Sequence, residues 1–252
     1  MLGIAAVAQV SSLLIGAVVM VAIGESLPDG SALWYSLGAG AVGSIGLLAL
    51  YQALATGVMS IAAPISALSA VIPFAWGIAS GESPAAFQLV GAAIALVGAL
   101  LASREPAHAH IPRAQFRNSV ILAAISALGI GTGLALLGMA SSGEAVPVIV
   151  ADRIATAGVI LPLALLRRQM PDSGPKGWLP PVAVGAFDTG ANVLYIAAFQ
   201  QGGLMSIVGL LSSLYPITTV LLARFLLAER LERHQAAGVA IALTGVALVG
   251  AG

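Results

Sequence analysis

The sequence predicts an all-α integral membrane protein with about nine transmembrane helices. Three observations carry this prediction: 59% of the 252 residues are hydrophobic, only 8% are charged, and the mean hydropathy is +1.03. A soluble domain carries about 25% charged residues, which cover its surface. Because this chain carries so few, most of its surface must face lipid rather than water.

The individual spans follow from the spacing of polar and Pro- or Gly-rich breaks. A helix needs about 20 apolar residues to cross roughly 30 Å of hydrocarbon. Nine runs of about this length cover residues 1–23, 32–54, 58–80, 85–103, 118–139, 145–167, 178–200, 203–226 and 235–251. Four of these runs contain prolines at which we expect kinks or broken helices, namely Pro64, Pro73, Pro162 and Pro216.

The positions of the charged residues predict the orientation, because Lys and Arg are retained on the cytoplasmic side of short loops. Nine of the ten basic residues fall on one side of the predicted membrane: Arg104, Arg113, Arg117, Arg167, Arg168, Lys176, Arg224, Arg230 and Arg233. The opposite side carries Glu25, Asp29, Glu82 and Glu144. We therefore predict that Met1 is cytoplasmic and Gly252 lies outside.

Two parts of the chain resemble each other. Gly91-Ala-Ala-Ile-Ala-Leu-Val-Gly98 matches Gly238-Val-Ala-Ile-Ala-Leu-Thr-Gly245 at an offset of 147 positions. Further matched pairs are Glu82 with Glu229 and Gln88 with Gln235 at the same offset, Met59–Ile61 with Met205–Ile207 at 146, and Trp34, Gly46, Leu50 and Tyr51 with Trp178, Gly190, Leu194 and Tyr195 at 144. The first four predicted helices thus correspond to the sixth to ninth.

Matched helices lie five spans apart, which is an odd number, so they cross the membrane in opposite directions. This inverted repeat of a five-helix unit is typical of secondary transporters, in which a midplane site opens alternately to each side. The span at 118–139 has no partner, so we expect that the first helix of the first repeat is missing ahead of Met1. The predicted organisation is a first repeat of four helices at 1–103, a cytoplasmic linker at 104–117, and a second repeat of five helices at 118–252.

Several motifs resemble those of the drug/metabolite transporter superfamily, specifically its ten-helix EamA-type members. The residues that carry the resemblance are Ser213-Leu-Tyr-Pro216, Ala228-Glu229-Arg230, Gln235 with Gly238–Gly245, the weaker copy Gly81-Glu82 to Gly98, and Asp152-Arg153. The resemblance implies export of amino acids, metabolites or drugs, coupled to protons or by exchange. The chain departs from the family pattern in its missing first helix and in a charge bias opposite to the usual orientation with both termini inside.

Charged residues inside spans are the strongest candidates for a site, because a charge at the bilayer centre costs at least about 2.5–3.5 kcal/mol. Asp188 lies about 15 Å into its span at 1.5 Å per residue, close to the midplane, and Arg153 lies at a similar depth. We expect their side chains to meet. Asp152 is adjacent to Arg153 and should point to another helix face, so Asp188 is the expected partner.

We predict that Asp188 carries a coupling proton or binds a substrate amine, and that Arg153 binds a carboxylate. A closed salt bridge that fixes helix packing is the alternative. Other residues that could line the cavity, or else form interhelical hydrogen bonds, are Tyr51, Gln52, Asn192, Tyr195, Ser212, Ser213 and Tyr215. Glu82 and Glu229 are expected at helix junctions near the interface, where they cap helices or pair with nearby groups.

An enzymatic function has little support. The chain has no cysteine, and His108, His110 and His234 fall in predicted loops, where they form at most a weak metal site. No phosphate-binding Gly-Lys signature is present. We therefore expect no cofactor, no bound metal and no nucleic-acid partner.

The predicted function is a secondary transporter in the cytoplasmic membrane that exports a small metabolite, amino acid or drug-like molecule. Its partners would be this substrate and the lipid bilayer, with a homodimer left open. The alternatives are a channel or lipid scramblase, or an inactive truncated transporter fragment.

Overall fold

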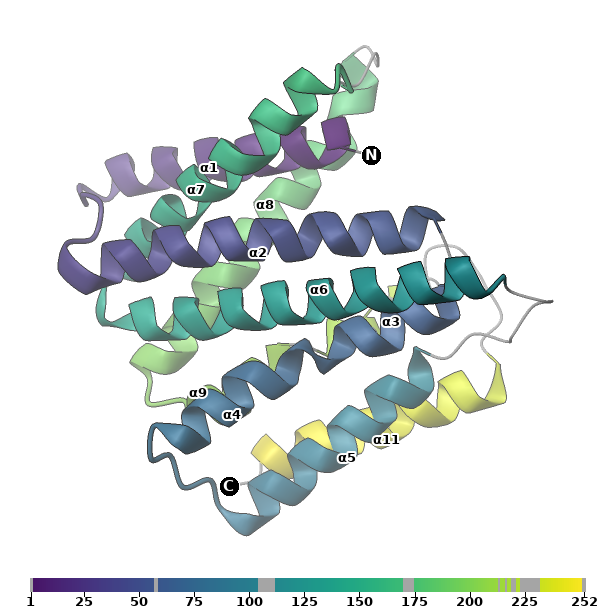
Figure 1. Ribbon diagram of the computed structural model, residues 1–252. Coiled ribbons are helices and arrows are strands. Elements are labelled where there is room, and N and C mark those ends of the chain that lie inside the picture. Colours follow the sequence, from purple (N-terminus) through teal and green to yellow (C-terminus); the bar gives the residue numbers. More distant parts are fainter. Residues whose placement is uncertain are drawn as a thin grey trace. The chain divides into compact units, whose positions relative to one another are not determined.

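The computed structural model describes residues 2–56, 59–103, 112–169, 175–212, 214–215, 217–218, 221–222 and 232–250. In these ranges the regular structure is helical throughout, with no strand (Figure 1). The chain divides into two units, Met1–Leu48 with Thr132–Gly203, and Ala49–Gly131 with Leu204–Gly252. Helices α2 (Gly30–Thr56) and α6 (Arg113–Met139) are divided between the units, so that one end of each helix belongs to the first unit and the other end to the second.

The first unit also contains α1 (Leu2–Ala22), the 3-10 turn η2 (Ala140–Ser142), α7 (Ala145–Leu166) and α8 (Pro175–Gln200). Helix α1 packs against both α7 and α8 (Figure 1). Apart from Val7, its buried residues are small or polar: Gly3, Ala5, Ala6, Ala8, Gln9, Ser12 and Gly16. Small residues let helix backbones approach closely, which replaces the hydrophobic driving force that is absent in lipid.

The second unit contains α3 (Met59–Ala67), the 3-10 turn η1 (Leu68–Ala70), α4 (Val71–Ala79), α5 (Ala86–Ala102), α9 (Met205–Ser212) and α11 (Arg233–Gly250). The 3-10 turn divides one predicted span into α3 and α4. Pro73 has no N–H with which to bond to the carbonyl of Ser69, so the α-helical ladder is interrupted there. The break expected near this proline is therefore present.

Helices α5 and α11 run antiparallel along a seam of four glycines, Gly91, Gly98, Gly238 and Gly245. A Cβ atom on Gly98 would overlap the backbone of Ala242 and Gly238, and one on Gly245 would overlap that of Ala95 and Gly91. Each contact maps onto the other when the two helices are exchanged at the offset of 147. This local two-fold relation is the one that an inverted repeat requires.

The two helices also begin in the same way. The side-chain oxygen of Gln88 accepts a hydrogen bond from the Ala85 N–H at 2.9 Å, and that of Gln235 accepts one from the Glu232 N–H at 3.1 Å. Each amide thus satisfies a backbone N–H at its helix start that would otherwise be unpaired. Ala85 and Glu232 are themselves 147 positions apart, so the repeat preserves the capping bond as well as the sequence.

The class prediction is confirmed. Within the described ranges, six helical stretches are long and apolar enough to cross a membrane, and Ala86–Ala102 is a shorter apolar helix. The predicted last span corresponds to α11, and the predicted span at 203–226 begins with α9. Much of the second half of that span lies outside the described residues. The motif Ser213–Pro216 lies outside them in part, and the motif Ala228–Arg230 lies outside them entirely.

Two helix starts differ from the prediction. Helix α6 begins at Arg113 rather than 118, and α8 at Pro175 rather than 178. The 27 residues of α6 extend over about 40 Å, so its first turns continue beyond a hydrocarbon core of about 30 Å. Arg113 and Arg117 are exposed there. The last five residues of the predicted linker are therefore helical, while residues 104–111, with His108 and His110, lie outside the described part.

Candidate functional site: an ionic cluster between α1, α7 and α8

The centre of the first unit holds one arginine shared by two carboxylates. Arg153 lies in the second turn to third turn of α7, and Asp188 lies at the middle of α8. The Arg153 Nη2 atom is 3.0 Å from Asp188 Oδ2, and its Nη1 atom is 3.2 Å from Asp152 Oδ2. The two side chains expected to meet therefore do so, and they form an ion pair.

A glutamine of α1 completes the cluster. Gln9 is 6% exposed, and its Oε1 accepts a hydrogen bond from Arg153 Nη1 at 3.2 Å. Its Nε2 donates a long bond to Asp188 Oδ2 at 3.5 Å. The amide contacts the cation through its oxygen and the anion through its nitrogen, which is the one orientation that satisfies both.

Asn192, one helical turn after Asp188, contacts the other carboxylate oxygen. Its Nδ2 atom is 3.0 Å from Asp188 Oδ1 and 2.8 Å from the Asp188 carbonyl oxygen. Both oxygens of Asp188 thus have donors, yet about a third of its side chain, 34%, is still accessible. Asp188 is the open member of the cluster, while Arg153 at 8% and Asp152 at 5% are closed in.

The cluster is not electrically balanced. Two carboxylates face one guanidinium, so with all three groups ionised its net charge is −1. Helix α1 contributes uncharged groups, and the spanning helices of this unit carry no further charged residue apart from Lys176 in the first turn of α8. Because charge inside a bilayer is costly, a cluster of three ionisable side chains in these helices is the strongest candidate for a functional site.

Close helix contacts hold the cluster in place. A Cβ atom on Gly40 of α2 would overlap the carbonyl of Asp152, and Thr156 Oγ1 donates to the Gly40 carbonyl at 3.2 Å. On the other side, Thr189 Oγ1 lies 2.6 Å from Ser12 Oγ and 2.9 Å from the Gly185 carbonyl oxygen. The backbone of α2 thus packs directly against Asp152 of α7, and Ser12 of α1 contacts Thr189, which follows Asp188 in α8. These contacts fix the four helices close to the charged groups.

One expectation about Arg153 was incomplete. Asp152 was expected to point away from Arg153 because adjacent helical residues face different directions, yet the two are in contact. The guanidinium is on a long flexible stem and reaches back past its own helix to its neighbour. Arg153 therefore has two acidic partners instead of one.

Tyr195 has a structural position. It is 5% exposed, its hydroxyl donates to the carbonyl of Leu134 at 2.9 Å, and its ring meets Phe199 edge to face with centroids 4.9 Å apart. The alternative of an interhelical hydrogen bond agrees with this geometry, and the expected role of Tyr195 at a binding site stays a prediction. Asn192 is the polar candidate of α8 that does join Asp188.

Three candidates lie in the second unit. Tyr51 and Gln52 are on the last turns of α2, and half-buried Tyr215 follows α9. Gln52 lines a cavity of about 520 Å³ together with Gln115, Asn118, Ile121 and Leu122 of α6. This group and the ionic cluster belong to different units, so the role of these three side chains at one common site stays a prediction.

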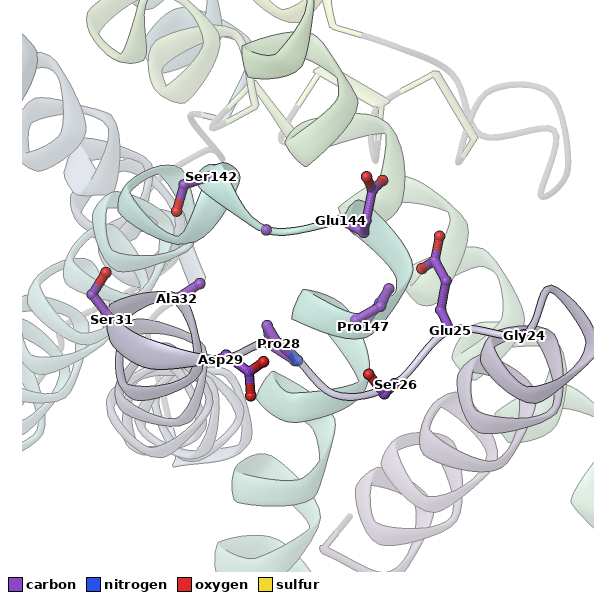
Figure 2. A pocket seen from close by; sticks show the side chains of 11 residues that line it. Gly24, Glu25, Ser26, Pro28, Asp29, Ser31, Ala32, Ser142, Glu144 and Pro147 are labelled. Carbon is purple, nitrogen blue, oxygen red and sulfur yellow. The ribbon is translucent and has the colours of Figure 1, made fainter.

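A second cavity, of about 390 Å³, lies in the first unit where α1 connects to α2 and where α7 begins. Figure 2 shows the carboxylates of Glu25, Asp29 and Glu144 around it, from the two connections that border it. Among the described residues that line it, none is basic. These acidic groups belong to the side predicted to lie outside.

Glu82 has the capping role expected of it. Its two carboxylate oxygens accept the backbone N–H groups of Met205 and Ser206, at 2.6 and 2.8 Å. These are the first residues of α9, where N–H groups have no partner within the helix and a negative charge is favoured. Glu229, for which the same role was expected, lies outside the described residues.

The comparisons with known proteins decide the family. The pattern of the EamA-like transporter family matches residues 117–251, which is more than half of the chain. The chain belongs to this family. The resemblance seen in the sequence is thereby confirmed, and this EamA-family chain is a membrane transporter of the drug/metabolite type.

Solved structures show the same fold. One chain, whose title reads "Crystal structure of protein", is similar over 99% of this chain and 88% of its own length, with a TM-score of 0.77 at 16% identity. Such a distant similarity establishes the fold but not the substrate. No curated protein matches this EamA-family sequence.

The sequence reasoning missed Gln9 and the contribution of Asp152. A signal for Gln9 was present, because it is an amide seven residues into the first described helix, deep in an otherwise apolar run. It also lies 144 positions before Arg153, the offset that relates Trp34 to Trp178. The two residues in contact thus occupy equivalent places in the two repeats.

Proposed function

We propose that this EamA-family chain is a secondary transporter that exports a small metabolite, amino acid or drug-like molecule by alternating access. In this proposal Asp188 binds the substrate or a coupling proton, and Arg153 holds Asp188 in place between turnovers. The family supports a transporter, and the ionic cluster supports the location of the site.

The observation that carries the proposal is the accessible carboxylate at the middle of a spanning helix. A closed salt bridge that served packing alone would bury both partners, because a charge in contact with lipid is costly. Here Arg153 is buried and Asp188 is 34% accessible. The pair is open on the side of the acid, as a group must be if it exchanges its partner.

Transport in proteoliposomes tests the proposal. The purified chain would be assayed for uptake of labelled amino acids, metabolites and cationic dyes, with and without a proton gradient, next to Asp188→Asn and the matched control Asp29→Asn. Asp29 is exposed in the loop before α2. We expect saturable uptake that falls at least about tenfold in Asp188→Asn and is unchanged in Asp29→Asn.

Unchanged uptake by Asp188→Asn would contradict the proposed role of Asp188 and would show that the ion pair serves helix packing only. Counterflow separates a carrier from a channel or a lipid scramblase. A carrier loaded with unlabelled substrate accelerates entry of labelled substrate, because one site faces the two sides in turn. Flux that rises linearly with concentration and shows no counterflow would favour the channel.

The proposed orientation has a direct test, because the chain has no native cysteine. Single cysteines at Ser26, between α1 and α2, and at Gln169, after α7, would be labelled in intact cells with a membrane-impermeant maleimide. The charge bias predicts labelling at Ser26 and protection at Gln169. The reverse pattern would invert the orientation and leave the fold unchanged.

A further inference from the structure

We propose that the second unit binds an anionic phospholipid where α2 ends and α6 begins, with the phosphate headgroup at that end and an acyl chain along α6. The site consists of a cavity of about 520 Å³ and of Arg113 and Arg117 in the turns of α6 before it. The residues that line the cavity are Gln52, Gln115, Asn118, Ile121 and Leu122. This inference is independent of the proposed transport function.

One exposed face of α6 changes from charged to apolar. Its members recur at spacings of three or four residues, so they share one side of the helix. They are Arg113, Arg117, Ile121, Ile125 and Leu128, and each is exposed. The change occurs within one helical turn, between Arg117 and Ile121. A phospholipid has the same order of groups, with a charged headgroup next to apolar chains.

This change falls at the expected boundary of the membrane. The hydrocarbon-spanning part of α6 is predicted to begin at residue 118. At about 1.5 Å per residue, Arg117 lies about 1.5 Å and Arg113 about 7.5 Å before that position. The headgroup layer of a bilayer is about 5–7.5 Å thick on each side. Both arginines therefore lie at the level of the lipid phosphates.

The charge at this end of the unit suits a phosphate. Among the described residues, no acid forms an ion pair with Arg113 or Arg117. The helix segments that border the cavity, 49–56 of α2 and 113–131 of α6, contain no other charged residue. A guanidinium group binds phosphate through two parallel N–H bonds. Anionic phosphate is therefore the ligand chemistry that fits these two side chains.

The cavity distinguishes a binding site from a basic surface. Arginines on the predicted cytoplasmic side follow the general charge bias of membrane proteins and need no ligand. Here a cavity of about 520 Å³ lies in the adjoining turns, within the range of about 300–1,000 Å³ that ligand pockets have. Gln52, Gln115 and Asn118 supply amide N–H groups that can donate to headgroup oxygens. In this proposal Gln52 contacts a headgroup, which differs from the substrate role predicted for it.

Fluorescence quenching in vesicles tests the proposal on the whole chain, which has no native cysteine. A bimane label is attached to Ile125→Cys, and phosphatidylglycerol with brominated acyl chains is titrated into phosphatidylcholine vesicles. Bromine quenches the label only at short range. We expect half-maximal quenching at an at least about tenfold lower mole fraction than with brominated phosphatidylcholine, because charge-assisted hydrogen bonds to phosphate contribute at least that factor. Leu243→Cys, at an exposed residue of α11, is the matched control without this preference.

Substitutions at the headgroup end should remove the preference measured at Ile125→Cys. Arg113→Gln combined with Arg117→Gln should abolish it, and Asn118→Leu should reduce it about threefold by removing one neutral hydrogen bond. Arg167→Gln combined with Arg168→Gln removes the same charge from the exposed end of α7 and should leave it unchanged. Excess glycerol phosphate should not displace the lipid, because it has no acyl chain.

Four results would overturn the proposal. Equal quenching by the two brominated lipids at Ile125→Cys would mean that no anionic lipid is selected there. The same preference at Leu243→Cys would make it a property of the whole surface, and equal losses in the two arginine pairs would attribute it to net charge. Displacement by glycerol phosphate would assign the cavity to a soluble phosphate compound.

The test remains decisive if the variant of Arg113 and Arg117 fails to fold, as judged by gel filtration and circular dichroism. Asn118→Leu keeps both charges, so an unchanged preference in that variant would refute the cavity as the headgroup site. None of these measurements requires transport. A chain that transports nothing but selects phosphatidylglycerol would therefore contradict the proposed function and leave the lipid site intact.

Discussion

The core of the first unit and the α5–α11 seam of the second unit are both tight helix contacts, but they are formed by different types of residue. Around Arg153 the helices meet through charges and amides that satisfy one another. Between α5 and α11 the contacts of the four glycines are with glycine and alanine backbones and with the apolar side chains of Leu248 and Val249. The first contact depends on charge balance and the second on size.

This difference teaches that apolar composition alone does not describe a membrane helix. Lipid tails are as apolar as leucine side chains, so helices associate through close packing or through polar contacts. Close packing has one stable arrangement, whereas a cluster with an open carboxylate can exchange a partner. We therefore expect the seam to stay fixed and the cluster to contain the binding site.

The largest effect is expected from removing the arginine of the cluster. Arg153→Met would leave the buried carboxylate of Asp152 without its cation and next to the carboxylate of Asp188, which should destabilise the fold by about 3–5 kcal/mol. Unfolding in detergent by added denaturant measures this cost. Arg167→Met, at an exposed residue that ends α7, is the control and should change little. Equal midpoints for the two variants would show that the cluster contributes nothing to stability.

The seam should respond to size instead of charge. Gly98→Val would force side-chain atoms into the backbone of Ala242 and should cost about 1–3 kcal/mol. By the two-fold relation, Gly245→Val should cost a similar amount. Gly158→Val in α7, where nothing lies within 4 Å of an added Cβ atom, is the matched control. A marked difference between Gly98→Val and Gly245→Val would break the proposed symmetry.

A smaller effect is expected at the start of α9. Glu82→Ala removes the acceptor of two backbone N–H groups and should cost about 0.5–2 kcal/mol, in the range of other helix caps. Glu144 also precedes a helix but makes no side-chain capping bond, so Glu144→Ala should cost less. Thermal unfolding of the two variants compares them. The cap would be unimportant if both lost the same stability.

The smallest effects are expected from the two matched glutamines. Gln88→Leu and Gln235→Leu each remove one capping hydrogen bond and should cost about 0.5–1.5 kcal/mol apiece. Gln169→Leu, at an exposed residue after α7, is the control. Similar losses of stability in the two variants would show that the two capping bonds are equivalent in energy as well as in geometry. A loss in one variant alone would contradict this equivalence.

Much of the fold could be predicted because the signals are local. Apolar runs of the right length correspond to the helices, and Pro73 marks a real break in one of them. The pairing of α5 with α11 also agrees with the repeated glycines. The helix starts were less predictable, since α6 and α8 continue past the apolar run, where exposed polar residues tolerate a helix as well as a loop.

The site could be predicted only in part. The depth of each residue along its helix was enough to predict the contact between Arg153 and Asp188. Opposite charges at the same depth in a membrane are expected to pair, because an unpaired charge there is costly. Gln9 was missed because an uncharged amide gives a weak signal until its helix neighbours are known. The contact with Asp152 depended on the path of one flexible side chain, which helix periodicity does not describe.

The two-fold relation holds for the packing of α5 and α11 but not for the charged residues. The α5–α11 seam presents the same contacts in the same order from either face of the membrane, so it cannot distinguish inward from outward movement. The cluster breaks this equivalence: positions 144 before Asp152, Arg153 and Asp188 hold Ala8, Gln9 and Ser44, none of them charged. The two faces of the membrane therefore meet equivalent contacts at the seam but different residues at the cluster.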